Sequence, residues 1–158
     1  MLFNDTIQWW GTSAKSRSHP HEGIDIYLTQ NIETGISNIL PQMLIPAILP
    51  GQPVHFHRDF LGETLYIRHP EIQEEGVILH TFYGHGRFDT DLNSSSYINK
   101  GDILGTISQP PATSAVPAHL HISCAWIKKD QQTAELNWEK MATNRNVHFI
   151  DPLPYLLR

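Results

Sequence analysis

The sequence predicts a mostly β domain, built as an antiparallel sheet sandwich or partly closed barrel with one or two short helices. Eleven prolines and ten glycines punctuate the 158 residues. The segments between them are short and rich in β-branched residues. Short strands separated by turn signals are typical of antiparallel β domains. A chain of this length most simply forms one domain over residues 1–158.

Seven segments fit strands, in chain order 24–28, 43–49, 53–58, 63–69, 76–83, 102–107 and 119–127. A modest helix is expected over 135–142. A second short helix is expected to open within 151–157, with Asp151 as its N-cap and Pro152 at its first helical position. The polar stretches at 88–96 and 108–117 are expected to be loops, and loops of this kind often border a functional cleft.

Composition excludes several classes of partner. The formal net charge is -5, from 11 basic and 16 acidic residues, and no basic cluster is present, which argues against nucleic acid. The longest apolar run, at 43–49, is interrupted by proline and is too short to span a membrane. No basic segment followed by an apolar stretch opens the chain, so no signal peptide is expected. The single cysteine, Cys124, is expected to be a small buried hydrophobe.

The stretch "HLH" places His119 and His121 two residues apart. Residues two apart in a strand project from the same face, so both imidazoles would point together while Leu120 and Ile122 face the other way. The residues that follow, "ISCAWI", favour a strand over a helix. Two imidazoles on one face are a common beginning of a metal site.

A second polar stretch, "HEGID", separates His21 from Asp25 by four residues. That spacing fits one face of a helix or of a strand, but Gly23 and the alternation of Ile24 and Ile26 favour extended structure. Together the two stretches offer two imidazoles, one carboxylate and a spare histidine. Three protein ligands with one open position is the pattern of a catalytic zinc site.

The other histidines divide into one functional candidate and several structural ones. His85 follows an apolar strand and lies between two glycines, and a strand end entering a loop suits a residue that orients a ligand or transfers a proton. His55 and His57 share the two-residue spacing but have no acidic neighbour at strand spacing, so we expect them to be structural or surface residues. Ordinary buried or solvated roles are expected for His19, His69, His80 and His148.

Taken in chain order, these stretches resemble the lysostaphin-type zinc metalloendopeptidases, the LytM-like family that cuts peptide bonds in bacterial peptidoglycan. "WGTSAKSRSHPHEGIDI" looks like the family's opening, which ends in His-x-x-x-Asp, and "FYGHG" is similar to its Tyr-x-His element. "GETLYIRH" and "INKGDILGTI" resemble strands that lie between the motifs. "PAHLHIS" matches the His-x-His motif and "FIDPLPYL" the Asp-Pro ending. The resemblance covers nearly the whole chain.

Carried over to this sequence, the resemblance implies one Zn²⁺ per chain, held by His21, Asp25 and His121. It also implies that His85 and His119 act as catalytic residues beside the water and the substrate. Which of these two histidines is the general base is left open.

The same resemblance implies an endopeptidase that hydrolyses amide bonds in peptidoglycan cross-links or stem peptides. Its groove would cross the sheet between loops near 86–96 and 108–118. The family resemblance leads us to expect a location in the cell envelope or outside the cell. The sequence departs from the family at Ser123, two residues beyond His121, where glutamate is frequent.

Two other functions fit parts of the pattern. One is a degenerate zinc- or peptidoglycan-binding regulatory domain on the same fold, which the presence of all five polar residues disfavours. The other is a non-haem iron oxygenase with two histidines and one carboxylate. Those sites usually place histidine and carboxylate two residues apart, whereas His21 and Asp25 are four apart.

Overall fold

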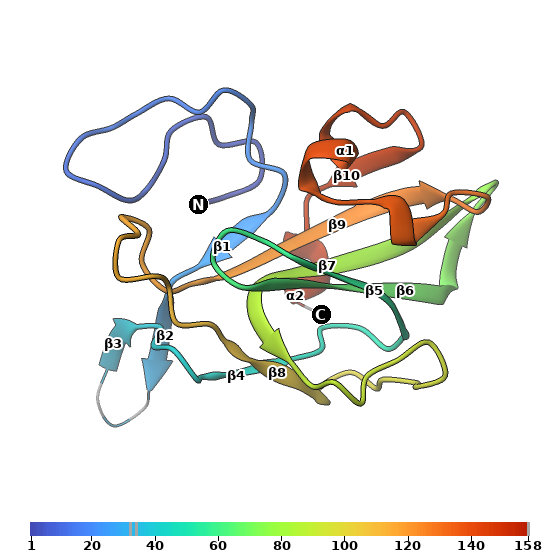
Figure 1. The fold of residues 1–158 in the computed structure, drawn as a ribbon, viewed down its shortest axis with the longest axis horizontal. Coiled ribbons are helices and arrows are strands. Elements are labelled where there is room, and N and C mark those ends of the chain that lie inside the picture. The colour runs from blue at the N-terminus through green and yellow to red at the C-terminus, as the bar shows by residue number, and fades with distance from the viewer. Residues whose placement is uncertain (32, 34, 158) are drawn as a thin grey trace.

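The computed structural model describes residues 1–158 except Ile32, Thr34 and Arg158, and it confirms a mostly antiparallel β fold. The strands are β1 (Ile24–Ile26), β2 (Leu28–Asn31), β3 (Gly35–Asn38), β4 (Leu44–Pro46), β5 (Gln52–Arg58), β6 (Glu63–Glu74), β7 (Val77–Phe88), β8 (Ile103–Ile107), β9 (Leu120–Lys128) and β10 (Val147–Ile150). Eight of them form one sheet, and β2 and β3 form a separate hairpin (Figure 1).

The long strands β7 and β9 organise the sheet. β6 runs along one edge of β7, with β5 beyond it. β9 and then β8 follow the other edge of β7, and β4 extends from β8. β1 and β10 lie in succession along the far edge of β9. The described strands therefore branch rather than close into a barrel.

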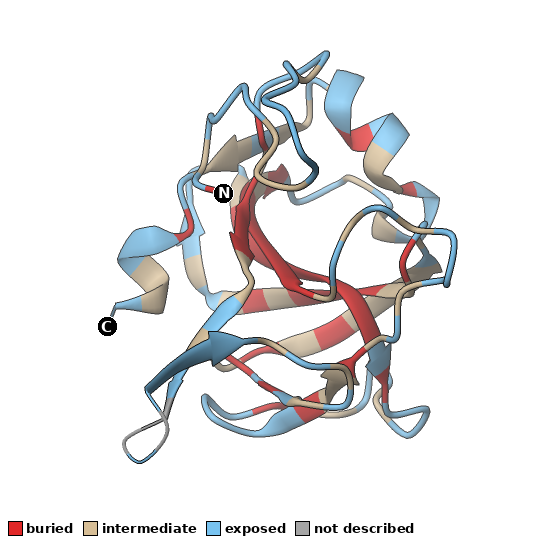
Figure 2. Ribbon diagram, turned by 90° about the vertical axis from the view of Figure 1, so that its left-hand side faces the viewer, coloured by how far each residue is buried: buried red, intermediate tan, exposed pale blue. Residues whose placement is uncertain are grey.

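Apolar side chains cover both faces of the central strands. β7 is buried almost continuously, which fits its position between β6 and β9. Successive residues of β7 point to opposite faces and belong to two hydrophobic clusters. One contains Tyr83 with Leu65 and Ile122, and the other contains Phe82 with Tyr66. The buried residues follow the middle of the sheet in Figure 2. The site described below is thus built on the buried middle of the sheet, which is a rigid support.

All seven predicted strands are present, with three differences from the prediction. The hairpin β2–β3 and the strand β10 were missed, because Gly35–Asn38 is exposed on every residue and so has no alternation of buried and exposed positions, and Val147–Ile150 is short. β7 continues to Phe88, so His85 lies inside a strand rather than at the start of a loop.

The two predicted helices are present but short. α1 (Trp138–Thr143) follows a 3-10 turn, η1 (Thr133–Glu135), and its N-cap Asn137 accepts a hydrogen bond from Lys140 N. α2 (Leu153–Leu156) begins one residue later than predicted, with Pro152 at the N-cap, although Asp151 Oδ1 accepts a hydrogen bond from Leu153 N. Within the described ranges, no helix has the length and apolarity needed to cross a membrane.

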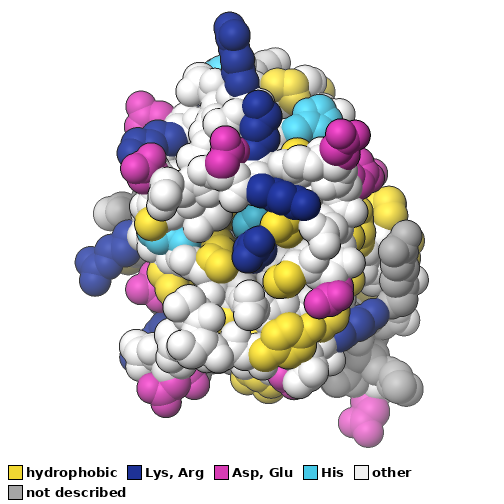
Figure 3. Space-filling model, turned by 90° about the vertical axis from the view of Figure 1, so that its right-hand side faces the viewer, with side chains coloured by type: hydrophobic (Ala, Val, Ile, Leu, Met, Phe, Trp, Pro, Cys, Tyr) yellow, Lys and Arg dark blue, Asp and Glu magenta, His cyan; other side chains and the backbone are white. Residues whose placement is uncertain are grey.

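The surface carries charges of both signs. On the face drawn in Figure 3, acidic side chains flank the lysines and arginines. The single cysteine, Cys124, is fully buried, as predicted.

Candidate metal centre and active site

The pairing of β1 with β9 brings two distant polar motifs together. Asp25 lies directly opposite His121 in the antiparallel register, with Ile24 opposite Ile122. Directly opposed residues project from the same face of a sheet, so the carboxylate and the imidazole meet. His21 lies just before β1 and is only 1% exposed.

Three donor atoms form a small triangle at this point. His21 Nε2 lies 3.1 Å from Asp25 Oδ1 and 3.1 Å from His121 Nδ1. The third side, from His121 Nδ1 to Asp25 Oδ1, is 2.9 Å. All three residues are buried. Donors about 2.0 Å from a zinc ion in a tetrahedron lie about 3.3 Å from one another, so the triangle has suitable dimensions.

Hydrogen bonds on the far side of each ring decide which atoms face the triangle. His21 Nδ1 donates to the carbonyl oxygen of Leu2 at 3.1 Å, because a carbonyl can only accept. This leaves the lone pair of His21 Nε2 facing inward. His121 Nε2 lies 2.7 Å from Ser123 Oγ, which places the lone pair of Nδ1 inward when the hydroxyl accepts. Two lone pairs and a carboxylate oxygen then converge without a proton between them, an arrangement that a cation would satisfy.

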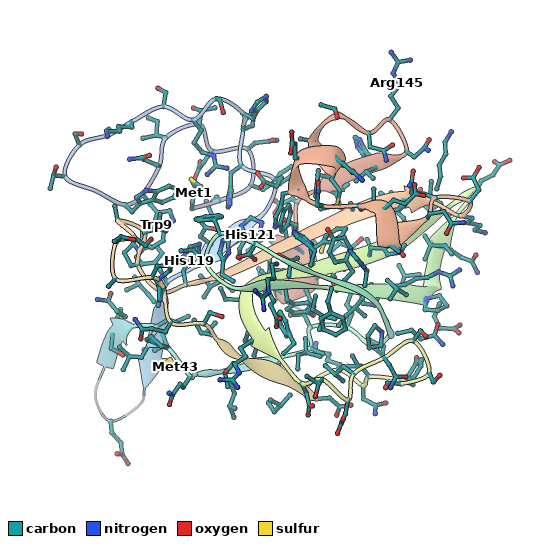
Figure 4. All side chains as sticks on the ribbon, in the orientation of Figure 1. Met1, Trp9, Met43, His119, His121 and Arg145 are labelled. Carbon is teal, nitrogen blue, oxygen red and sulfur yellow. The ribbon has the colours of Figure 1, made fainter. Side chains whose placement is uncertain are left out.

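The second oxygen of Asp25 is held by an indole. Trp9 Nε1 donates to Asp25 Oδ2 at 2.7 Å, and its ring stacks on Tyr27 with centroids 4.2 Å apart. Figure 4 shows Trp9 near His119 and His121, and the rings of Trp9 and His119 meet edge to face at 5.4 Å. Trp9 therefore leaves Asp25 Oδ1 as the oxygen available to a metal.

The surroundings of the site shift the pKa values of Asp25 and His121. Burial by itself would raise the pKa of Asp25, but hydrogen bonds and charge interactions with His121 and His21 outweigh it and hold that pKa well below its usual range. Burial lowers the pKa of His121, and Asp25 only partly opposes this. A charged carboxylate beside a neutral imidazole, as at Asp25 and His121, is the ligand state that metal binding requires.

His85 and His119 lie beside this triangle. Their rings are 4.7 Å apart, and both are buried. His119 Nδ1 donates to Pro117 O at 2.9 Å, while its Nε2 lies 3.5 Å from Asp25 Oδ1. Burial lowers the pKa of His119 to about 4, with Asp25 opposing the shift. All five predicted site residues therefore line one cavity of 150 Å³.

The walls of this cavity differ from the prediction. Val116, from the predicted loop 108–118, contributes one side. The loop 86–96 contributes no lining residue, because β7 carries the chain away to Phe88 and Leu92 packs into the core instead. The other walls come from the N-terminal segment, from the turn after β5 and from α1, through Trp10, Arg17, Phe60 and Trp138.

His55 and His57 stand apart from the three-ligand cluster, on β5. Their rings stack at 6.2 Å and both contact the ring of Tyr66. Burial lowers the pKa of each, so both are neutral side chains packed against the sheet. His69 has both ring nitrogens hydrogen-bonded, to Pro50 O and Thr81 Oγ1.

Replacing both His55 and His57 with glutamine is expected to leave the zinc content unchanged. Neither side chain belongs to the donor triangle, and glutamine keeps a polar, uncharged group of similar reach. Metal analysis after dialysis, with circular dichroism as the check on folding, makes the measurement. Loss of zinc from a folded double variant would show that the wrong pair was chosen.

Sequence reasoning missed four contributors to the site. Trp9 and Trp138 belong to no recognisable motif, and Ser123 was noted only as a departure from the family. Asp59 was missed as well, although its place three residues before Gly62 is a common turn signal. The turn could have been predicted from that signal, but not its contact with His85, 26 residues further on.

The fold is similar to those of several solved structures. The catalytic domain of EnpA, a prophage-encoded M23 protein from Enterococcus faecalis, solved as a point mutant, matches with a TM-score of 0.52 and 17% identity, over 90% of this chain and 84% of that one. LytU matches with a TM-score of 0.48 and 18% identity, over 92% of this chain and 90% of that one. Lysostaphin from Staphylococcus simulans matches with a TM-score of 0.47 and 19% identity, over 75% of this chain and 41% of that one.

Comparison of the sequence alone finds no relative. No protein-family model matches it, and no curated protein matches it either. At 17% identity, the match with EnpA shows that the two chains share a fold. The resemblance predicted from the order of the motifs is confirmed at the level of the fold: this chain folds like the M23 catalytic domain of EnpA.

Proposed function

We propose that the protein is a zinc metalloendopeptidase that hydrolyses amide bonds in peptidoglycan cross-links or stem peptides. The observation that carries the proposal is the convergence of His21 Nε2, Asp25 Oδ1 and His121 Nδ1 in one buried triangle. Two imidazoles and one carboxylate are the donor set of several catalytic zinc sites.

The residues fit the metal chemically as well as geometrically. Leu2 and Ser123 orient the two imidazoles, and Trp9 restrains the carboxylate. Such outer contacts fix the direction of ligand lone pairs and are typical of functional metal sites. Zinc, when bound, polarises a carbonyl oxygen and lowers the pKa of a water molecule toward neutrality.

The remaining work falls to His85 and His119. Both line the cavity next to the donor triangle, with their rings 4.7 Å apart. One imidazole can take the proton of the attacking water, and the other can donate a hydrogen bond to the oxygen that becomes negative. Five functional side chains facing one cavity favour an active enzyme over a degenerate binding domain.

The substrate class rests on the resemblance and on the fold. The matched EnpA domain is described as the catalytic domain of an M23 protein, and the motifs of this chain resemble those of peptidoglycan endopeptidases. The cavity is bordered by Phe60 and Trp138 together with Arg17 and Glu22, which pair at 3.4 Å. Apolar surface beside a charged pair suits a peptide that carries both aliphatic and charged groups.

The test combines metal analysis with digestion of purified peptidoglycan. We expect about one zinc per chain by elemental analysis, and new peptide termini by mass spectrometry of the products. A chelator should abolish turnover and added zinc should restore it. Iron as the tightly held metal would favour an oxygenase instead. Retained zinc without any cleavage would indicate a binding domain on the same fold.

A further inference from the structure

We propose that Asp59 is a positioning residue for His85, fixing both its ring and its backbone so that His85 presents Nε2 to the cavity. This inference deepens the proposed peptidase function and rests on it for its catalytic consequence. Its structural part stands on contacts that do not involve the metal ligands.

Asp59 lies in the turn between β5 and β6, and its side chain is only 1% exposed. Five donors surround its carboxylate. Oδ1 accepts from Leu61 N at 2.9 Å, Gly62 N at 2.8 Å and His85 Nδ1 at 3.0 Å. Oδ2 accepts from Thr64 Oγ1 at 2.8 Å and from His85 N at 2.9 Å.

These contacts determine the state of the His85 ring. A carboxylate that faces only donors stays ionised: burial raises the pKa of Asp59, but the hydrogen bonds and charge of His85 outweigh this and hold it well below its usual range. An ionised carboxylate is an acceptor only, so His85 Nδ1 carries the proton. His85 Nε2 has no hydrogen-bond partner within the described part of the chain and is the atom that remains for chemistry.

Asp59 also holds an unusual backbone. His85 has a φ of 64°, in the left-handed region that non-glycine residues rarely adopt. The bond from His85 N to Asp59 Oδ2 stabilises this local distortion of β7, and the bond from His85 Nδ1 to Oδ1 aligns the ring at the same time. The two oxygens of one carboxylate thus fix both the backbone and the ring of His85.

Asp59 is itself held in place by a hydrogen bond from the buried Thr64. Thr64 Oγ1 donates to Asp59 and accepts a hydrogen bond from Trp138 Nε1 at 3.0 Å. Thr64 is fully buried, so this chain of contacts is shielded from water. His119 has no comparable arrangement, because its Nδ1 contacts a backbone carbonyl, that of Pro117. The cavity therefore holds two histidines with different supports, and of these two only His85 has its Nδ1 held by a charged group.

The first test is spectroscopic and uses the unmodified protein. In ¹⁵N-histidine spectra of the zinc-loaded chain, neutral His85 should be the tautomer protonated at Nδ1, with its signals assigned by their absence from His85→Gln. The tautomer protonated at Nε2 would overturn the inference. This measurement requires no enzymatic activity, so it decides the positioning role even if the protein cleaves nothing.

The second test uses Asp59→Asn, which retains an acceptor for the turn amides but places an NH₂ group among donors. The NH₂ group would face His85 N, and a neutral amide would no longer stabilise a positive charge on the His85 ring. We therefore expect unchanged zinc content, a KM within about threefold of the parent and a kcat lower by roughly a hundredfold or more. Asp102→Asn is the matched control, since Asp102 also accepts a backbone N–H in a turn, that of Asn99, and does not line the cavity. A kcat close to that of the parent would refute the role of Asp59.

The failures of the two proposals are distinguishable. A parent protein that binds zinc but cleaves no peptidoglycan refutes the proposed function, and the tautomer then decides on Asp59 alone. If Asp59→Asn does not fold, the spectrum of the parent still gives the decision.

Discussion

Replacing His121 with alanine is expected to remove zinc and peptidoglycan turnover together, whereas replacing His119 with alanine should remove turnover alone. His121 Nδ1 lies 2.9 Å from Asp25 Oδ1 and belongs to the donor triangle. His119 Nε2 is farther, at 3.5 Å, and its ring faces His85. Without His121 only His21 and Asp25 remain, too few donors to hold zinc tightly.

The loss caused by His119→Ala should be roughly a hundredfold or more in rate, the usual contribution of a proton-transfer or oxyanion group. Zinc content after dialysis and turnover are measured on the same preparations. His148→Ala serves as the control, because His148 is exposed on β10, and it should retain both properties. Zinc lost from His119→Ala but kept by His121→Ala would reverse the assignment. Two variants that keep zinc and still cut would defeat the metallopeptidase proposal.

Replacing Gly23 with alanine is expected to weaken zinc binding by roughly tenfold or more, because the ligands would lose their spacing. An added Cβ would meet Ile122 O and Ser123 Oγ at impossible separations and would lie 2.9 Å from His121 Nε2. The side chain of Ser123 can rotate, but the carbonyl of Ile122 is part of β9 and cannot. β1 must then move away from β9, which separates His21 and Asp25 from His121.

The control for this prediction is Gly76→Ala, in the turn between β6 and β7. Gly76 has a φ of 77°, and an added Cβ would meet open space. That variant should lose about 1 kcal/mol of stability from the left-handed backbone but should keep its zinc. Competitive titration with a chelator measures affinity, and thermal unfolding measures stability. Parental zinc affinity in Gly23→Ala would show that the strands yield more easily than the contacts indicate.

The site residues that could be predicted are those whose spacing within a short stretch of sequence already indicates that they lie together. Two-residue spacing in a strand placed His119 and His121 near each other, and four-residue spacing with Gly23 between did the same for His21 and Asp25. That these two pairs form one site was predicted from the donor set that they make together and from the family resemblance, since pairing of β1 with β9 joins residues 96 apart and leaves no local pattern. The strands were found for the same reason as the pairs, because alternation and turn residues are local.

The residues that support the site could not be found in this way. Trp9, Asp59 and Trp138 support the site through side-chain hydrogen bonds to residues that lie 16, 26 and 74 positions away in the sequence. A lone tryptophan or aspartate has the same sequence signature whether it packs, caps a turn or orients a ligand. Only the assembled sheet shows which of these it does. The left-handed backbone of His85 is equally invisible in the sequence, since its neighbours Gly84 and Gly86 are the positions where such a conformation would be expected.

The pairing of a three-residue first strand with β9 has a consequence for the order of assembly. β1 has only three register partners, Ile122, His121 and Leu120, so its own ladder is a weak anchor. A cation held by residues from both strands would act as a cross-link between positions 96 residues apart, and such closure restricts the unfolded chain much as a disulfide does. Because its last ligand lies in β9, the cross-link cannot form while only the earlier strands exist. Tight metal binding would therefore mark a chain in which β1 and β9 have already paired.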